Sequence, residues 1–299
     1  MSEQNFIISF GDQEAQQAFV KQYQSFLLGL EDIKKAIDIV IFNGKRKNKA
    51  DRVIYYLARM AFEDFNEILV LCANGLSTGA MKILRGMFER TVVLMYLHKH
   101  PDEVDLFLEF FWISHYKLGQ AIETAFPDSL SQEALNEAKE NRDRVKPLFQ
   151  VTDCRRCGTT RTNFTWAKKD LVAMAKEVGM NKVMIAGYYL PMEETHSTVG
   201  SIFRRMGLIR TPEAIDFDDN PKPSEDTRTL FMAHTLLLFT LDCLKKHFNL
   251  EMMDEAFDKC QKKFFDFWES NKKKDAVSEN GETIGGIPNL PQTGGSEVF

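Results

Sequence analysis

No apolar run in this sequence of 299 residues is long enough to span a bilayer without meeting a charged residue. The first residues, MSEQNFIISFGDQ, lack the basic start and the small-residue cleavage pattern of a signal peptide. The sequence also has no glycine-rich phosphate-binding loop, no internal repeat and no strand-rich region. We therefore expect a soluble, cytoplasmic protein that stays outside membranes, and we predict no cofactor.

Cysteine is scarce, and the five cysteines are an odd number at scattered positions, which favours a reducing compartment and thiols that serve packing. Cys154 and Cys157 form a CxxC pair, but no second CxxC or His pair stands at the spacing of a zinc site. The pair alone leaves a metal half-site and a redox couple open, and we predict a basic loop without a metal. The loop runs to Asn163 and is expected to be irregular.

The formal net charge of −5 argues against a general nucleic-acid coat protein. Two local basic clusters nevertheless make nucleic acid a candidate partner, and the alternative for such a charge run is a solvated surface. The clusters are Lys45, Arg46 and Lys47 in one segment and Arg155 and Arg156 in another.

Apolar residues recur with the 3.6-residue period of helices over most of the chain. We predict an all-α fold: a single, mostly antiparallel multi-helix domain over residues 1–275. Residues 276–299 are rich in Gly, Pro and polar residues and have too few apolar side chains to stabilise an ordered structure, so a disordered tail is expected there. His115, on an aromatic helix, is expected to be a hydrogen-bonded core residue.

The helix expected from Ser77 to His98 is apolar on nearly every side, which is typical of a buried central helix. It carries Arg85 and Glu89 at positions i and i+4, where the two side chains can pair. One hypothesis is a buried ion pair that fixes the helix in place, because an unpaired buried guanidinium is costly. The other makes the pair the floor of a polar pocket between helices.

A second polar group follows downstream, where Tyr188, Glu194 and His196 surround Pro191. Proline is expected to prevent a continuous helix here, so the group forms either part of a site or a surface turn that caps the next helix. The order ILRGMFERTVVLMYL, then a Trp-led helix, then YYLPMEETHS resembles an uncharacterised all-helical bacterial family, classed as a domain of unknown function. The resemblance runs from about Arg52 to Met206, and Glu193 stands where the family has a small hydroxyl residue.

In that family an arginine and a glutamate on one helix precede a tyrosine and a Ser-x-x-His-like element. The resemblance therefore implies a site of four residues, which are Arg85, Glu89, Tyr188 and His196. The family brings no established reaction, so no chemistry is implied.

Arg228 and His234 lie near the start of a later apolar helix. Their spacing is similar to that of the HEPN superfamily of helical ribonucleases and nucleotide-binding proteins. The similarity implies a metal-independent ribonuclease, acting in stress or phage defence, with His234 as acid or base and Arg228 against the phosphate charge. The sequence thus leaves two functions open: a module that binds a ligand, peptide or nucleic acid in a polar interhelical pocket, and this ribonuclease. A homodimer is a further hypothesis.

Overall fold

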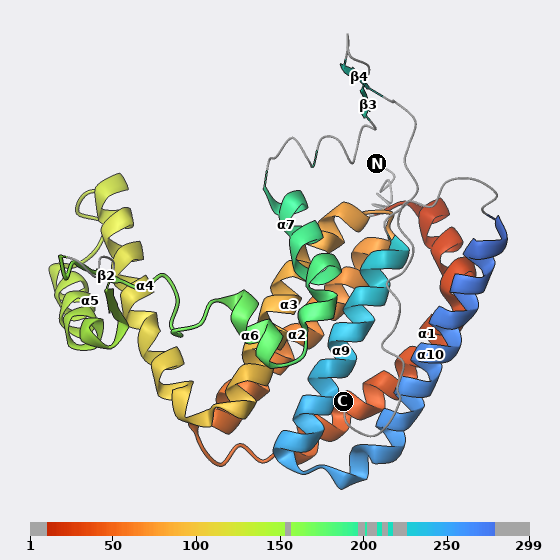
Figure 1. Ribbon diagram of the computed structural model, residues 1–299, viewed down its shortest axis with the longest axis horizontal. Coiled ribbons are helices and arrows are strands. Elements are labelled where there is room, and N and C mark those ends of the chain that lie inside the picture. Colours follow the sequence, from red (N-terminus) through yellow and green to blue (C-terminus); the bar gives the residue numbers. More distant parts are fainter. Residues whose placement is uncertain are drawn as a thin grey trace, which may run out of the picture.

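A computed structural model describes residues 11–152, 157–196, 201, 208–210, 215–217 and 226–278; side chains are described for all of these except 208–210, 215–217 and 271–278. It confirms the all-α class (Figure 1). The long helices are α1 (Gln13–Asn43), α2 (Lys49–Ala73), α3 (Ser77–Lys99), α4 (Val104–Ala125), α9 (Asp226–Phe248) and α10 (Asp254–Ser278). The short helices are α5 (Gln132–Val145), α6 (Leu171–Glu177) and α7 (Leu190–Thr195).

Single turns link these helices: η1 (Pro101–Glu103), η2 (Lys146–Phe149), η3 (Asn181–Val183), η5 (Glu251–Met253) and the π-helix η4 (Ile185–Tyr189). Two short antiparallel strand pairs complete the described part, β1 (Gln150–Thr152) with β2 (Thr160–Thr162) and β3 (Leu208–Arg210) with β4 (Ile215–Phe217). The β1–β2 pair corrects the expectation of an irregular loop up to Asn163. Its ladder satisfies backbone groups that a polar loop would leave to water.

Side-chain caps explain where several helices begin. The carboxylate of Asp12 accepts hydrogen bonds from the backbone of Glu14 and Ala15 at the start of α1. Asn48 and Asp51 cap each other's backbone at the start of α2, which satisfies amides that have no partner in the first turn. Helix α6 begins at Leu171, where the side chain of Asp170 accepts from the backbone of Ala173.

The core lies where α2, α3 and α9 pack side by side, while α1 and α10 pair along one side of this group (Figure 1). Helix α3 is central, as its apolar sequence predicts, because α2, α6, α7 and α9 all contact it. Phe88 and Leu97 of α3, Leu237 of α9 and Trp268 of α10 belong to one continuous cluster of fully buried side chains.

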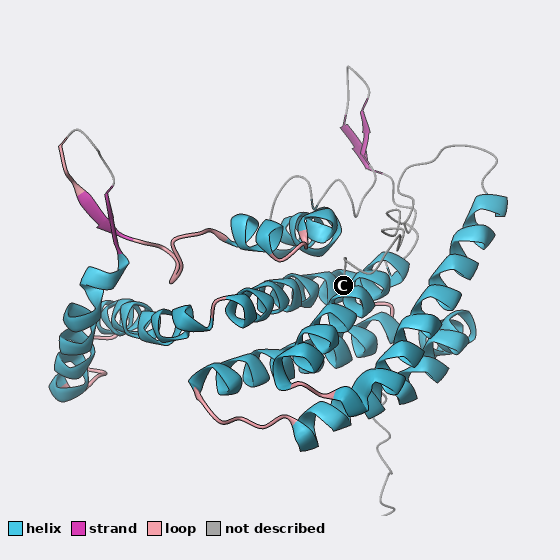
Figure 2. Cartoon of the chain, turned by 60° about the horizontal axis from the view of Figure 1, so that its bottom comes forward, coloured by secondary structure: helices cyan, strands magenta, loops and turns pink. Residues whose placement is uncertain are grey.

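Residues 104–162, here called the arm, leave the bundle and project from it (Figure 2). The arm consists of α4, α5 and the β1–β2 pair, and it has its own small core of Ile113, Val145 and Phe149. Helix α10 continues to Ser278, so residues 276–278 of the expected tail are helical. Residues 279–299, Cys154, Arg155 and Arg156 lie outside the described residues. None of the described helices combines the length and the apolar content needed to cross a membrane.

Candidate functional site

The site is built where the π-helix η4 and α7 pack against α3 (Figure 1). Gly187 makes the close approach possible, because a Cβ there would stand 2.7 Å from Cδ2 of Phe88 on α3. The wider turn of a π-helix is rare and is frequently found at functional sites. Here the π-helix contains Tyr188, whose ring centre is 5.7 Å from that of Phe88.

Arg85 is the centre of the cluster. Its Nε donates to Oε1 of Glu89 over 3.0 Å, as the i and i+4 spacing predicts. Its Nη1 lies 3.2 Å from Nε2 of His196, and its guanidinium carbon lies 5.3 Å from the centre of the Tyr188 ring. The structure therefore brings together all four residues that the resemblance implies, from two segments far apart in the sequence.

The electrostatics of the cluster follow from these contacts. A guanidinium has only donors, so in this contact Nη1 of Arg85 donates and Nε2 of His196 accepts through its lone pair. Tyr188 offers its ring face to the same cation, which adds a cation–π attraction. His196 is exposed, so the cluster is open to solvent on that side.

The hypothesis of a fully buried ion pair is wrong. The Arg85 side chain keeps 23% of its surface exposed and that of Glu89 keeps 42%. The pair lies on the side of α3 where η4 and α7 cover it incompletely, while α2 and α9 bury other positions of the helix. Because both side chains remain partly hydrated, their ion pair adds little to the stability of the fold. Arg85 also remains accessible to a ligand.

Pro191 does not interrupt the helix, contrary to expectation. It lies in the first turn of α7, directly after η4, where a missing backbone N–H costs little. Tyr188 is therefore in a π-helical turn, Glu194 is buried within α7, and His196 is its C-cap. Glu193 lies in the same helix rather than in a surface turn.

Arg228 and His234 both lie on α9, but His234 is a core residue, 4% exposed. Its Nδ1 accepts from Nε1 of Trp268 over 3.3 Å, and its Nε2 has no hydrogen-bond partner. Burial lowers its pKa to about 3, because the imidazolium would be desolvated. An imidazole enclosed in this way can neither reach a substrate nor exchange protons with it near neutral pH.

The sequence analysis missed a second polar group at the junction of three helices. Nδ1 of His98 on α3 lies 3.1 Å from Nδ1 of His247 on α9, and Nε2 of His247 lies 3.1 Å from Oδ1 of Asp51 on α2. Asp51 also accepts from the backbone of Lys47, so the basic loop is tied to the two histidines. Asp51 and His247 are 196 positions apart, so no local sequence pattern could predict that they are in contact.

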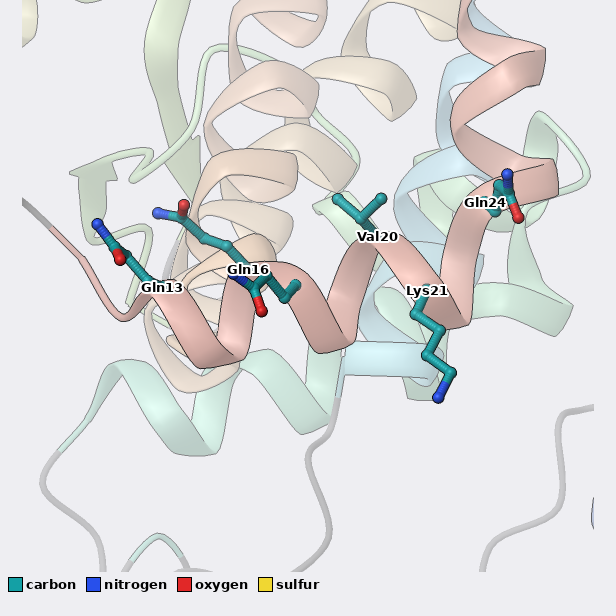
Figure 3. A pocket seen from close by; sticks show the side chains of 6 residues that line it. Gln13, Gln16, Val20, Lys21 and Gln24 are labelled. Atoms are coloured by element: carbon teal, nitrogen blue, oxygen red, sulfur yellow. The ribbon is translucent and has the colours of Figure 1, made fainter.

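The described part of the chain shows no metal site beside the Arg85 cluster. No three His, Cys, Asp or Glu side chains are grouped there as a metal ion would require. A hollow of about 610 Å³ lies along one face of α1, and Figure 3 shows its lining. Its lining residues come from this single helix and are Gln13, Gln16, Gln17, Val20, Lys21 and Gln24. Lys21 is the only charged residue among them, so this hollow offers few groups for binding or catalysis.

The fold and the site together define a class of protein: an all-helical domain with a partly exposed polar cluster on its central helix. Residues 51–213, more than half of the chain, match the model described as Family of unknown function (DUF5677), and the chain belongs to this family. This confirms the resemblance to an uncharacterised all-helical family, and the four residues that the resemblance implies as a site lie within the matched residues. Arg228 and His234 lie beyond them. No curated protein and no solved structure matches the sequence.

Proposed function

We propose that this protein is a binding module and that Arg85, Glu89, Tyr188 and His196 form its ligand site. The observation that supports the proposal is the guanidinium of Arg85, held in place by three side chains and still partly exposed. An arginine with a fixed orientation recognises planar anionic groups through paired hydrogen bonds. The ligand therefore carries a carboxylate or a phosphate, on a small molecule, a peptide or a nucleic acid.

Each neighbour has a role in this proposal. Glu89 holds Nε of Arg85, which leaves the outer edge of the guanidinium for the ligand. Tyr188 supports the cation from its ring face, and His196 is an exposed second group beside it. His196 accepts from Arg85 in the structure, so it would exchange this hydrogen bond for one with the ligand.

A nucleic acid would find further cations in the loop before α2, where Lys45 and Lys47 are exposed and Arg46 lies 4.4 Å from the centre of the Tyr55 ring. The ribonuclease hypothesis has no comparable support, because burial takes His234 out of acid–base chemistry. We therefore treat nucleic acid as one possible carrier of the phosphate and not as a substrate to be cleaved.

Thermal melts with three probes test the proposal: inorganic phosphate, succinate and a short single-stranded RNA. A probe at 100 times its Kd adds about 2.7 kcal/mol to the free energy of unfolding, which raises the melting temperature by several degrees. Arg85→Gln should abolish this shift. The matched control is Arg59→Gln, because Arg59 forms the same i and i+4 pair with Glu63, at 3.1 Å, on α2.

Loss of the shift in Arg85→Gln with retention in Arg59→Gln would support the site. A wild-type protein that responds to none of the three probes, or an Arg85→Gln variant that responds as strongly as wild type, would overturn it. If RNA alone gives a shift, Lys45→Gln with Lys47→Gln tests whether the basic loop contributes.

A further inference from the structure

Helix α4 has apolar side chains on two faces, and the described chain covers one of them. The inner face packs on α5 and η2, where Phe110 meets the ring of Phe149 and Ile113 is buried. On the other face Leu108, Phe111 and Leu118 are 41%, 55% and 58% exposed. Single exposed apolar residues are ordinary, whereas a row of them on one face marks an interaction surface.

The exposed residues form a continuous row. Leu108, Phe111, His115 and Leu118 follow one another at i, i+3, i+7 and i+10, a spacing that places them on one side of a helix. We call these four residues the outer stripe. His115 is exposed and stacks on Phe111, with ring centres 4.9 Å apart, so the expectation that His115 belongs to the core is wrong. Its ring extends the apolar surface.

The outer stripe is symmetric about its middle. Leu108 and Leu118 each stand five positions from Ile113, and Phe111 and His115 each stand two positions from it. Two such helices that run antiparallel about a twofold axis at Ile113 would therefore place Leu108 against Leu118 and Phe111 against His115, twice over. A self-complementary patch of this kind is what a twofold interface requires.

Charge does not oppose the same partner. The stripe contains no Asp, Glu, Lys or Arg, so a second copy brings no like charges together at its centre, although the whole chain has a net charge of −5. The arm projects from the bundle, so the pairing helix stands clear of the larger core (Figures 1 and 2). We infer that the outer stripe is the contact surface of a homodimer, formed by antiparallel pairing of α4 with α4 of a second copy.

The test measures the mass of the full chain by sedimentation velocity over a range of concentrations. The inference predicts a species of twice 34.4 kDa that dissociates on dilution. Phe111→Asp should raise the dimer Kd by about tenfold or more, because it places two charges near the twofold axis. Phe42→Asp, on α1, makes the same change at a phenylalanine outside the arm that is 82% exposed, and it should leave the Kd unchanged. Because Phe111 is exposed, both variants should melt like wild type.

A charge exchange tests the antiparallel register itself. Leu108→Glu and Leu118→Lys should each weaken the dimer alone, and the double variant should restore it, since the twofold axis then places opposite charges together. A chain that stays monomeric at all concentrations overturns the inference. So does a dimer that Phe111→Asp does not weaken, or a double variant no better than either single one. These outcomes do not depend on Arg85 and leave the proposed ligand site to its own test.

Discussion

Protonation of His234 should make the stability of the whole fold depend on pH in a predictable way. Its ring packs edge-on against Phe264 and Phe26, with ring centres 4.8 Å and 5.3 Å away, and its Nε2 has no hydrogen-bond partner. Burial lowers its pKa from 6.5 to about 3. Below pH 6.5 the imidazole of His234 therefore binds a proton in the unfolded chain but not in the folded chain. The free energy of unfolding is highest above that pH and falls as the pH is lowered.

The magnitude follows from the linkage between protons and unfolding. Each pH unit between 6.5 and the lowered pKa removes about 1.4 kcal/mol of the free energy of unfolding. At pH 4.5 the loss from this single residue is about 2.7 kcal/mol, and it stops growing below pH 3 or so, when the folded chain also binds the proton. A loss of this size is a large fraction of the stability of an ordinary domain.

Urea unfolding from pH 7.5 to pH 4.5 measures this loss, and His234→Phe isolates it from the titration of other groups. Phenylalanine suits the aromatic surroundings but leaves Nε1 of Trp268 without its acceptor, so the variant should lose about 1–3 kcal/mol at pH 7.5. Its stability should then fall less steeply with pH than that of wild type, by about the amount derived above. Equal slopes in the two proteins would refute the reasoning and show that His234 gains access to water.

The other predictions concern the site and its packing, and urea unfolding measures each. Arg85→Ala should cost less than about 1 kcal/mol, close to the cost of Arg59→Ala, because both ion pairs are partly exposed; a cost near 3 kcal/mol would indicate a buried pair. Gly187→Ala should destabilise by about 1–3 kcal/mol, since its Cβ would stand 2.7 Å from Phe88. Gly79→Ala, whose Cβ would lie at an ordinary 3.6 Å from Leu71, should instead stabilise α3 slightly. Equal effects of the two glycine changes would contradict the close packing of η4 on α3.

Periodicity in the sequence predicted helices over most of the chain, because the long helices bury apolar side chains. Side-chain caps at Asp12 and Asn48 also explain where α1 and α2 begin. Helix α3 shows the role of periodicity most clearly: its apolar surroundings predicted a central position, and the i and i+4 spacing predicted the bond between Arg85 and Glu89. The same apolar neighbours led to the wrong expectation of a buried pair. Exposure at one turn depends on how far η4 and α7 reach across α3, which local sequence does not encode.

The meeting of Tyr188 and His196 with Arg85 could be anticipated only through the family resemblance, because more than 100 positions separate the two segments. Pro191 was misleading for a local reason, since a proline in the first turn of a helix needs no hydrogen-bond partner. His234 shows the reverse problem. Its distance in sequence from Arg228 suggested chemistry, and only tertiary packing reveals the aromatic shell around it. The contact between His98 and His247 also arises from packing alone.

The Nε–H resonance of Arg85 tests directly whether this side chain binds an anionic ligand. The signal is assigned by its absence in Arg85→Gln, and the protein is then titrated with inorganic phosphate and, separately, with succinate. We expect one of the two anions to shift the Arg85 signal in a saturable way while the Arg59 signal stays in place. If neither anion moves the Arg85 signal, or if both arginines respond alike and without saturation, Arg85 and its three neighbours belong to the scaffold and not to a binding site.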